Sequence, residues 1–198
     1  MTANIIIALA AGIFAGYFIV PPAVAQHTEL LITIMLCILL FFVGVDIGHN
    51  KSVFRQLKKH GSLLLAVPLA IIAGSTIGGL AGAWILGMPV NEGLAIASGY
   101  GWYSLSGVLL TRLHGADLGT IAFLTNITRE VLAILTIPFI AKYINHLTTI
   151  APAGATSMDV ALPLISSFTT EEVTVIAFVN GAILSSLVPI LVPFFYAL

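Results

Sequence analysis

The chain has 198 residues, of which 59% are hydrophobic and only 8% are charged. Because about a quarter of the residues in a soluble domain are charged, this composition excludes a soluble protein and predicts a single integral membrane domain over residues 1–198. The net charge of −1 leaves no broad basic surface, which argues against nucleic acid as a partner.

Seven apolar segments predict an all-α, polytopic membrane protein, since each spanning helix needs about 20 residues. The segments cover residues 3–20, 28–47, 61–86, 91–112, 117–143, 151–168 and 171–197. The first is also compatible with a signal peptide, because Ala23-Val24-Ala25 has the small residues of a cleavage site. No basic residue precedes the apolar run, and we therefore predict a retained span.

The loop between the second and third segments sets the orientation. It contains Lys51, Arg55, Lys58 and Lys59, and the positive-inside rule places such a loop in the cytoplasm. Counting seven crossings predicts a cytoplasmic amino terminus and a carboxyl terminus outside. At the cytoplasmic end of the second segment, Asp46 is either an ordinary interfacial carboxylate or an access site for a ligand.

The fourth segment contains the string GYGWYSLSG between Gly99 and Gly107. Its glycines and serines weaken a helix, and such interruptions persist in a bilayer only where the backbone is buried in protein or lines a wet cavity. Close helix packing through small residues is the alternative. If the break lines a cavity, we expect a ligand to contact Tyr103, Ser104 and Ser106.

The fifth segment carries a polar cluster near its centre, in the string NITRE. Asn126, Thr128, Arg129 and Glu130 lie there, at the depth farthest from water on either side. An ionised side chain at the centre of a membrane helix costs about 2.5–3.5 kcal/mol, so these residues predict a functional site with partners or water.

The sixth segment has prolines on both sides of the string GATSMDVAL, and this pattern predicts a discontinuous helix. In transporters the ends of such half-helices face the substrate near the middle of the bilayer. Backbone N–H groups around Gly154, Thr156 and Ser157 are candidates for binding an anionic group. Asp159 supplies a negative charge close by.

These three segments bring their unusual residues to the same predicted depth, which favours one shared site. On a helix Asn126 and Glu130 share a face, whereas Arg129 points about 100° away from Glu130. We therefore expect Arg129 to reach Asp159 on the neighbouring segment. A closed ion pair without a role in transport is the alternative.

Four strings resemble the lysine exporter family LysO. They are FFVGVDIG at residues 41–48, GYGWYSLSGVLLT at 99–111, NITRE at 126–130, and GATSMD at 154–159 with LP shortly after it. The chain is similar to the carboxy-terminal two-thirds of longer members, which carry further spans in front. The resemblance implies export of L-lysine and of its analogue thialysine across the bacterial inner membrane. It also implies that two intramembrane acidic positions matter, and by motif these are Glu130 and Asp159.

The shorter length predicts that the chain works with a second short membrane subunit or as a homodimer. If the partner supplies the spans that longer members carry in front, the assembly would have about ten helices in two inverted repeats. The mechanism we expect is antiport. The lysine carboxylate would meet Arg129 or the backbone N–H groups of the sixth segment, and its ammonium groups would meet Glu130 and Asp159. Because burial favours the protonated form of a carboxyl group, protons would compete for these residues, with sodium as the other candidate ion.

Two other classes of function remain open at this point. One is an antiporter of cations or organic ions with a similar fold, and the other is a non-transporting membrane subunit. An enzyme is not expected, because no histidine lies within a span to activate Ser104 or Ser106. The single cysteine, Cys37, and the scattered histidines have no metal-ligand spacing, so we expect no metal and no cofactor.

Overall fold

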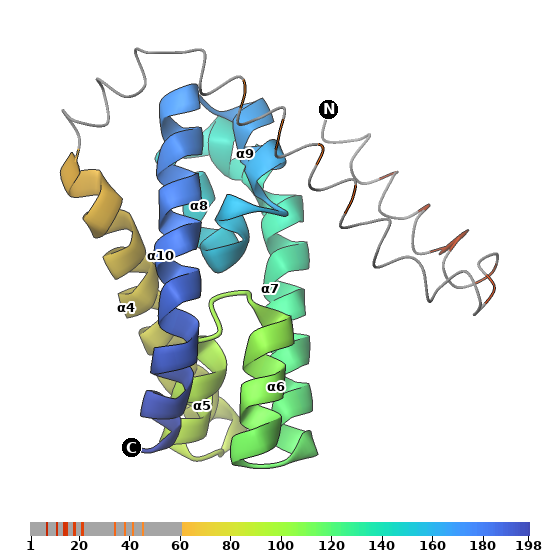
Figure 1. The fold of residues 1–198 in the computed structure, drawn as a ribbon, viewed down its shortest axis with the longest axis vertical. Coiled ribbons are helices and arrows are strands. Elements are labelled where there is room, and N and C mark those ends of the chain that lie inside the picture. Colours follow the sequence, from red (N-terminus) through yellow and green to blue (C-terminus); the bar gives the residue numbers. More distant parts are fainter. Residues whose placement is uncertain are drawn as a thin grey trace. The chain divides into compact units, whose positions relative to one another are not determined.

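A computed structural model describes residues 61–198 without interruption, together with ten single positions between residues 7 and 45 (Figure 1). Backbone contacts divide the chain into two units, Met1–Asp46 and Ile47–Leu198. Most of the first two predicted segments, the basic loop and the possible access site Asp46 lie outside the described residues.

Residues 61–198 form helices and short turns, and this part contains no strand, which confirms the all-α prediction for it. The helices are α4 Gly61–Leu86, α5 Val90–Ala97, α6 Tyr103–Leu113, α7 Ala116–Tyr143, α8 Ile150–Ala153, α9 Leu162–Phe168 and α10 Glu171–Tyr196. Two 3-10 turns, η1 Leu147–Thr149 and η2 Gly154–Met158, flank α8.

Three of these helices, α4, α7 and α10, are long and apolar enough to cross a membrane. They contain 26, 28 and 26 residues, and at 1.5 Å per residue each exceeds the roughly 30 Å of a hydrocarbon core. The predicted segments 61–86, 117–143 and 171–197 match them to within one residue at either end. Among residues 61–198 these are the three candidate spans. The crossings predicted for the first two segments stay predictions, because most of those residues are not described.

The helix ends follow from local chemistry. Gly87, at φ +64°, ends α4, and Pro89 directly precedes α5. Gly115, at φ +137°, separates α6 from α7 with a backbone that other residues rarely adopt. At the start of α10 the Thr170 side chain accepts a hydrogen bond from the backbone N–H of Val173, as an N-cap residue does.

Helices α5 and α6 form a hairpin that turns back halfway along the bundle (Figure 1). The start of α5 and the end of α6 meet at one end of the bundle, where His114 lies 3.5 Å from Glu92 and 3.1 Å from the Tyr196 hydroxyl. Asn91 also donates a hydrogen bond to the Tyr196 carbonyl. The fourth predicted segment is therefore re-entrant in this structure and does not cross the bundle.

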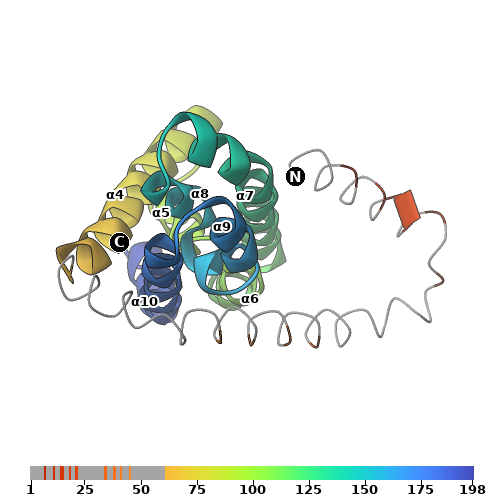
Figure 2. The same cartoon turned by 90° about the horizontal axis from the view of Figure 1, so that it is seen from above.

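Helices α8 and α9 form a second hairpin, which enters from the opposite end of the bundle (Figure 1). Seen from above, α8 lies between α4 and α7, and it contacts both helices (Figure 2). The prediction that the sixth segment is discontinuous is confirmed, because the α-helix ends at Ala153 and starts again at Leu162. This segment is re-entrant as well.

The two hairpins change the predicted path of the chain. Arg112 lies at the end of the bundle opposite to the start of α4, and Lys142 lies at the same end as that start (Figure 1). This is the reverse of what seven full crossings predict for these two residues. Because both hairpins return to the end from which they enter, the direction predicted for α10 is unchanged.

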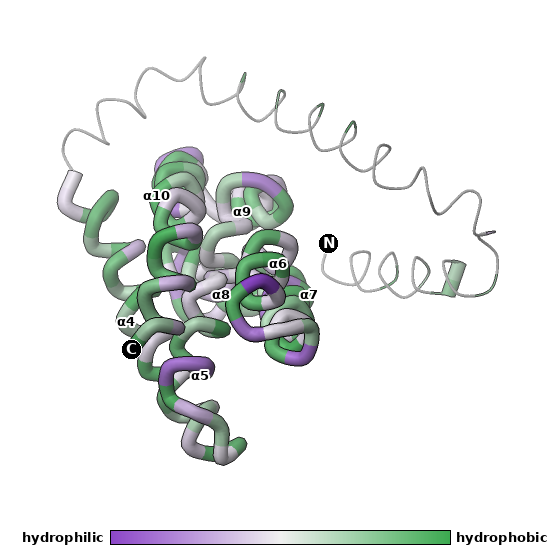
Figure 3. Tube along the Cα trace, turned by 60° about the horizontal axis from the view of Figure 1, so that its bottom comes forward, coloured by the Kyte–Doolittle hydropathy of each residue, from purple (hydrophilic) through white to green (hydrophobic). Residues whose placement is uncertain are grey.

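Helix α10 is the central helix of the described bundle. In its most apolar stretch 50% of the residues are buried, whereas in the corresponding stretch of α4 17% of the residues are buried. It packs against both hairpins, and its Gly181 lets η2 approach so closely that a Cβ there would lie 2.5 Å from the Met158 backbone nitrogen. By contrast α4 is hydrophobic along most of its length and largely exposed, with Trp84 at 85% (Figure 3).

Candidate functional site

The tips of the two hairpins touch each other at the middle of the bundle. The backbone N–H of Ala155 donates a 2.8 Å hydrogen bond to the carbonyl of Tyr100. Tyr100, Gly101 and Gly154 all have positive φ values, of 47°, 100° and 61°. A Cβ at Gly154 would collide with the Tyr100 carbonyl, so only glycine permits this contact.

Asn126 of α7 holds the tip of the first hairpin in place. Its side-chain oxygen accepts a 2.7 Å hydrogen bond from the backbone N–H of Gly101. Its amide nitrogen donates to the carbonyls of Ile96, at 3.1 Å, and Ala122, at 2.9 Å, and also lies 3.3 Å from the Ser106 hydroxyl. The side chain is 2% exposed, and its hydrogen-bonding capacity is used within the protein.

Ser157 and Asn180 support the tip of the second hairpin. The Ser157 hydroxyl lies 2.8 Å from the Gly154 carbonyl and 2.7 Å from the Ala177 carbonyl of α10. The Asn180 amide nitrogen lies 3.1 Å from the same Gly154 carbonyl and 3.0 Å from the Ser157 hydroxyl. We conclude that the helix break at Gly154 is fastened to α10 by side-chain hydrogen bonds. The position of Asn180 in the last apolar segment favours helix packing over ligand binding, and these contacts agree with that prediction.

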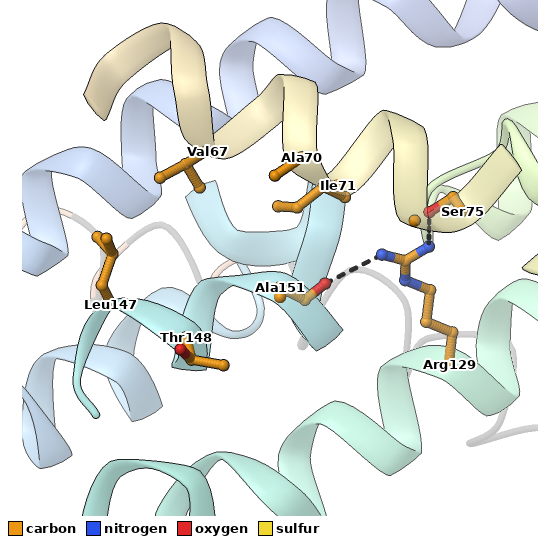
Figure 4. A pocket seen from close by; sticks show the side chains of 9 residues that line it. Val67, Ala70, Ile71, Ser75, Arg129, Leu147, Thr148 and Ala151 are labelled. Atoms are coloured by element: carbon orange, nitrogen blue, oxygen red, sulfur yellow. Dashed lines mark hydrogen bonds between the residues drawn. The ribbon is translucent and has the colours of Figure 1, made fainter. Parts of the chain in front are cut away.

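Arg129 does not reach Asp159, which corrects the sequence prediction. Its Nε donates to the Pro152 carbonyl at 3.0 Å. Nη2 donates to the Ala151 carbonyl at 3.0 Å, and Nη1 donates to the Ser75 hydroxyl at 2.9 Å (Figure 4). The guanidinium turns instead towards the carbonyl groups that the short helix α8 leaves without helical partners. Within the described range, 61–198, Arg129 has no acidic partner at ion-pairing distance.

Glu130 of α7 and Asp159, which follows η2, lie within electrostatic range of each other, and both are partly buried. Asp159 accepts a 2.6 Å hydrogen bond from the backbone N–H of Val160. The Oε2 atom of Glu130 is buried and has no hydrogen-bond partner among the described residues. Neither carboxylate pairs with Arg129, so the alternative of a closed ion pair does not hold in this part of the chain.

Of the other residues predicted for the site, two serve the helix breaks and two lie on α6, facing α7. Ser106 and Thr156 are buried and donate to the backbone carbonyls of Trp102 and Ala153, both at 2.9 Å, so they stabilise the breaks. Tyr103 packs its ring edge against Phe123, with centroids 5.4 Å apart. Ser104 is exposed and lines a hollow of about 380 Å³ between α6 and α7, away from the tips.

Three further hollows meet at Arg129. One of about 560 Å³ lies between α4, α7 and α8, one of about 280 Å³ runs along α4 and α5, and one of about 580 Å³ lies between α7 and Pro152. Glu130 and Asp159 line none of these three. The sequence analysis missed the contribution of α4, although Gly74, Gly78 and Gly82 show the four-residue spacing of a smooth helix face.

Comparison with known proteins gives consistent results. A family model described as lysine exporter LysO matches residues 6–196. The chain is 41% identical over 177 residues to "Lysine exporter LysO" of Escherichia coli K12, an alignment that covers 88% of this chain but 58% of that protein. It is 39% identical over 163 residues to "Putative lysine exporter" of Haemophilus influenzae, covering 81% of this chain and 82% of that protein.

The chain thus spans little more than half the length of its Escherichia coli relative, as the resemblance to part of longer members predicts. No solved structure matches it. The match of the family model over nearly all residues, together with identities near 40%, shows that the chain belongs to the lysine exporter LysO family.

Proposed function

We propose that this protein is a secondary transporter that exports L-lysine across the inner membrane and binds the ammonium groups of lysine between Glu130 and Asp159. The names of the two relatives support lysine as the substrate. Three long apolar helices and two opposed hairpins support transport, since discontinuous helices that meet inside a bundle form substrate sites in many transporters.

One observation carries the proposal, namely the buried Oε2 atom of Glu130 without a hydrogen-bond donor. A buried acceptor without a partner costs about 1–3 kcal/mol, and more when it is charged. An ammonium group has three N–H donors and a positive charge, so it would satisfy both this atom and the nearby Asp159 carboxylate. Thialysine carries the same two ammonium groups and would bind in the same way.

The coupling step in this proposal is an exchange between protons and lysine. With lysine absent, two carboxylates that face each other away from water are stable when at least one of them is protonated. A proton taken from outside would leave the empty site with one negative charge instead of two on its return, and lysine would displace this proton on the cytoplasmic side. Efflux would then stop when a protonophore removes the proton gradient. Continued efflux that depends on sodium would favour sodium as the coupling ion.

A partner subunit forms a further part of the proposal. The exposed apolar surface of α4, including Trp84, Ile85 and Leu86, is suited to contact lipid or another membrane helix. We infer that the working unit is a homodimer or a pair with a second short membrane protein. Cross-linking in native membranes followed by mass determination tests this, and a single chain that transports lysine in liposomes contradicts it.

The decisive experiment measures release of labelled lysine from liposomes that contain the purified protein. We expect Glu130→Gln and Asp159→Asn each to lower the rate by about tenfold or more, since hydrogen bonds to charged groups contribute about 1.5–3 kcal/mol. The exchange removes a charge and keeps the shape of the side chain. Ser186→Ala is a matched control, because this exposed hydroxyl of α10 contacts only the carbonyl of Ala182.

Two results would contradict the proposal. The first is a wild-type protein that releases no lysine under any ion gradient, even when it is reconstituted with any chain that cross-links to it in native membranes. The second is normal lysine release by either carboxylate variant, provided that the variant inserts and unfolds like the wild type.

A further inference from the structure

The hollows beside Arg129 have the size of a site for a small molecule. The largest that includes α4 measures about 560 Å³, within the roughly 300–1,000 Å³ of typical ligand pockets. Figure 4 shows Arg129 at its edge, with Val67, Ala70 and Ile71 of α4 along one wall. The smaller hollow continues from Arg129 along the same helix.

The glycines of α4 keep this space open. At Gly74, Gly78 and Gly82 a Cβ would have no atom within 4 Å. Gly74 lines the larger hollow, whereas Gly78 and Gly82 line the smaller one. At these three positions α4 presents only backbone to the hollows, whereas Val67, Ala70 and Ile71 contribute side chains to the wall of the larger one.

The charge of Arg129 is not neutralised by the described part of the chain. A guanidinium has five N–H groups, and three of them donate to the uncharged acceptors Pro152, Ala151 and Ser75. One N–H on each terminal nitrogen remains, which is enough for two hydrogen bonds to a single carboxylate. A cation at the centre of a 28-residue membrane helix that lacks an anion is a strong indication of a ligand site.

We propose that Arg129 binds the α-carboxylate of the exported amino acid in this hollow. The inference rests on the proposed function and adds a second contact to it. The ammonium site at Glu130 and the carboxylate site at Arg129 belong to adjacent residues of α7, which point about 100° apart around the helix. Among the backbone N–H groups around Gly154 to Ser157, which the sequence offers as the other candidates, that of Ala155 already donates to the Tyr100 carbonyl.

The position of Arg129 along its helix decides between two sources of an anion. Residue 129 is the fourteenth of the 28 residues of α7, so about 20 Å of helix separates it from either end. A lipid phosphate stays at the membrane surface and would not reach this depth. The carboxylate of a substrate moving through the bundle would pass it.

Competition between lysine and cadaverine tests the inference, because cadaverine is the same diamine without the carboxylate. Labelled lysine bound to the reconstituted wild-type protein should be displaced by lysine at a concentration at least about tenfold lower than by cadaverine. In Arg129→Gln we expect lysine affinity to fall by about 10- to 100-fold while cadaverine affinity, measured directly, stays within about twofold. The preference for lysine should then almost disappear.

Ser75→Ala provides a second variant that leaves the charge in place. It removes one acceptor that orients the guanidinium, and we expect lysine affinity to fall by about two- to tenfold without a change for cadaverine. Should Arg129→Gln fail to fold, this variant alone decides the matter.

Three outcomes overturn the inference. They are a wild type without preference for lysine, an unchanged preference in both variants, or an equal loss of lysine and cadaverine, which would mean that Arg129 only stabilises the break after α8. A wild type that binds neither diamine contradicts the proposed function itself, so the two failures are distinguishable.

Discussion

The two hairpins meet at their tips, yet they differ in whether a carboxylate beside the tip is left without a hydrogen-bond partner among the described residues. In the α5–α6 hairpin, Asn126 and Ser106 satisfy the backbone of the break, and no ionisable carboxylate lies at the tip. In the α8–α9 hairpin, the break is fastened by Ser157 and Asn180. Beside it, Asp159 accepts from the backbone N–H of Val160, but the buried Oε2 atom of Glu130 has no donor among the described residues. The backbone groups of the first break are hydrogen-bonded within the protein, which suits a structural role. Beside the second tip, a carboxylate oxygen remains available for a ligand.

The difference teaches how a membrane protein can hold charge at its centre. An unwound backbone costs little when neutral side chains satisfy it, as Asn126 does for Gly101. A buried carboxylate oxygen without a donor, such as Oε2 of Glu130, is costly in every state that lacks a cation or a proton. The carboxylate that needs a ligand, Glu130, therefore lies beside a helix break that the protein itself holds rigid, at Gly154.

The largest effect on stability should come from Gly154→Ala. The new methyl group would collide with the Tyr100 carbonyl, and the backbone at φ +61° is unfavourable for alanine, so we expect a loss of about 2–6 kcal/mol in the free energy of unfolding. Gly101→Ala is the matched variant of the other hairpin, where the Cβ would lie 3.3 Å from the nearest atom and the loss should be smaller. Denaturant unfolding in detergent measures both. Equal losses would mean that the two tips are equally constrained.

Asn126→Ala should have the next largest effect. It leaves the buried N–H of Gly101 without an acceptor and creates a small cavity, for which we expect a loss of about 2–4 kcal/mol. Asn126→Asp is the control, since it keeps an acceptor for that N–H but removes the donor to Ile96. If Asn126→Ala unfolds like the wild type, the first hairpin is not held by this side chain.

The sequence predicts the three long helices well, because a run of apolar residues between glycine, proline and charged ends has one structural outcome in a bilayer. It also predicts both breaks from the glycines at 99–107 and the prolines around 151–168. It does not predict that these segments turn back, since a broken apolar run of about 20 residues has the same composition whether it crosses or returns. The return depends on the tertiary contact between Tyr100 and Ala155.

The direction of Arg129 is the other feature that the sequence could not provide. Helix geometry separates it from Glu130 by about 100° but does not say which neighbour each side chain meets. Asp159 follows a break whose path was unknown, and Ser75 lies on a helix with no evident polar stripe. The carbonyl groups freed at Ala151 and Pro152 attract the guanidinium instead.

Glu130→Gln should separate binding from stability. Although it should abolish most lysine efflux, we expect the free energy of unfolding to stay the same or to rise by up to about 1 kcal/mol, because a buried carboxylate without a donor is replaced by a neutral amide. Denaturant unfolding of Glu130→Gln and of Asn126→Ala, whose site lies one turn away on α7, compares the two changes in the free energy of unfolding. A loss as large as that of Asn126→Ala would show that Glu130 is a structural residue.

The smallest effect should come from the base of the first hairpin. There the Tyr196 hydroxyl and the Nδ1 atom of His114 share a hydrogen bond. The His114 side chain is 42% exposed and also lies near Glu92. Exposed contacts of this kind contribute about 0–1 kcal/mol, so Tyr196→Phe should lower the free energy of unfolding by no more than that and leave lysine efflux unchanged. The same unfolding and efflux measurements check it. A larger loss would mean that the α5–α6 hairpin is anchored mainly at its base, through Tyr196, and not at its buried tip, through Asn126.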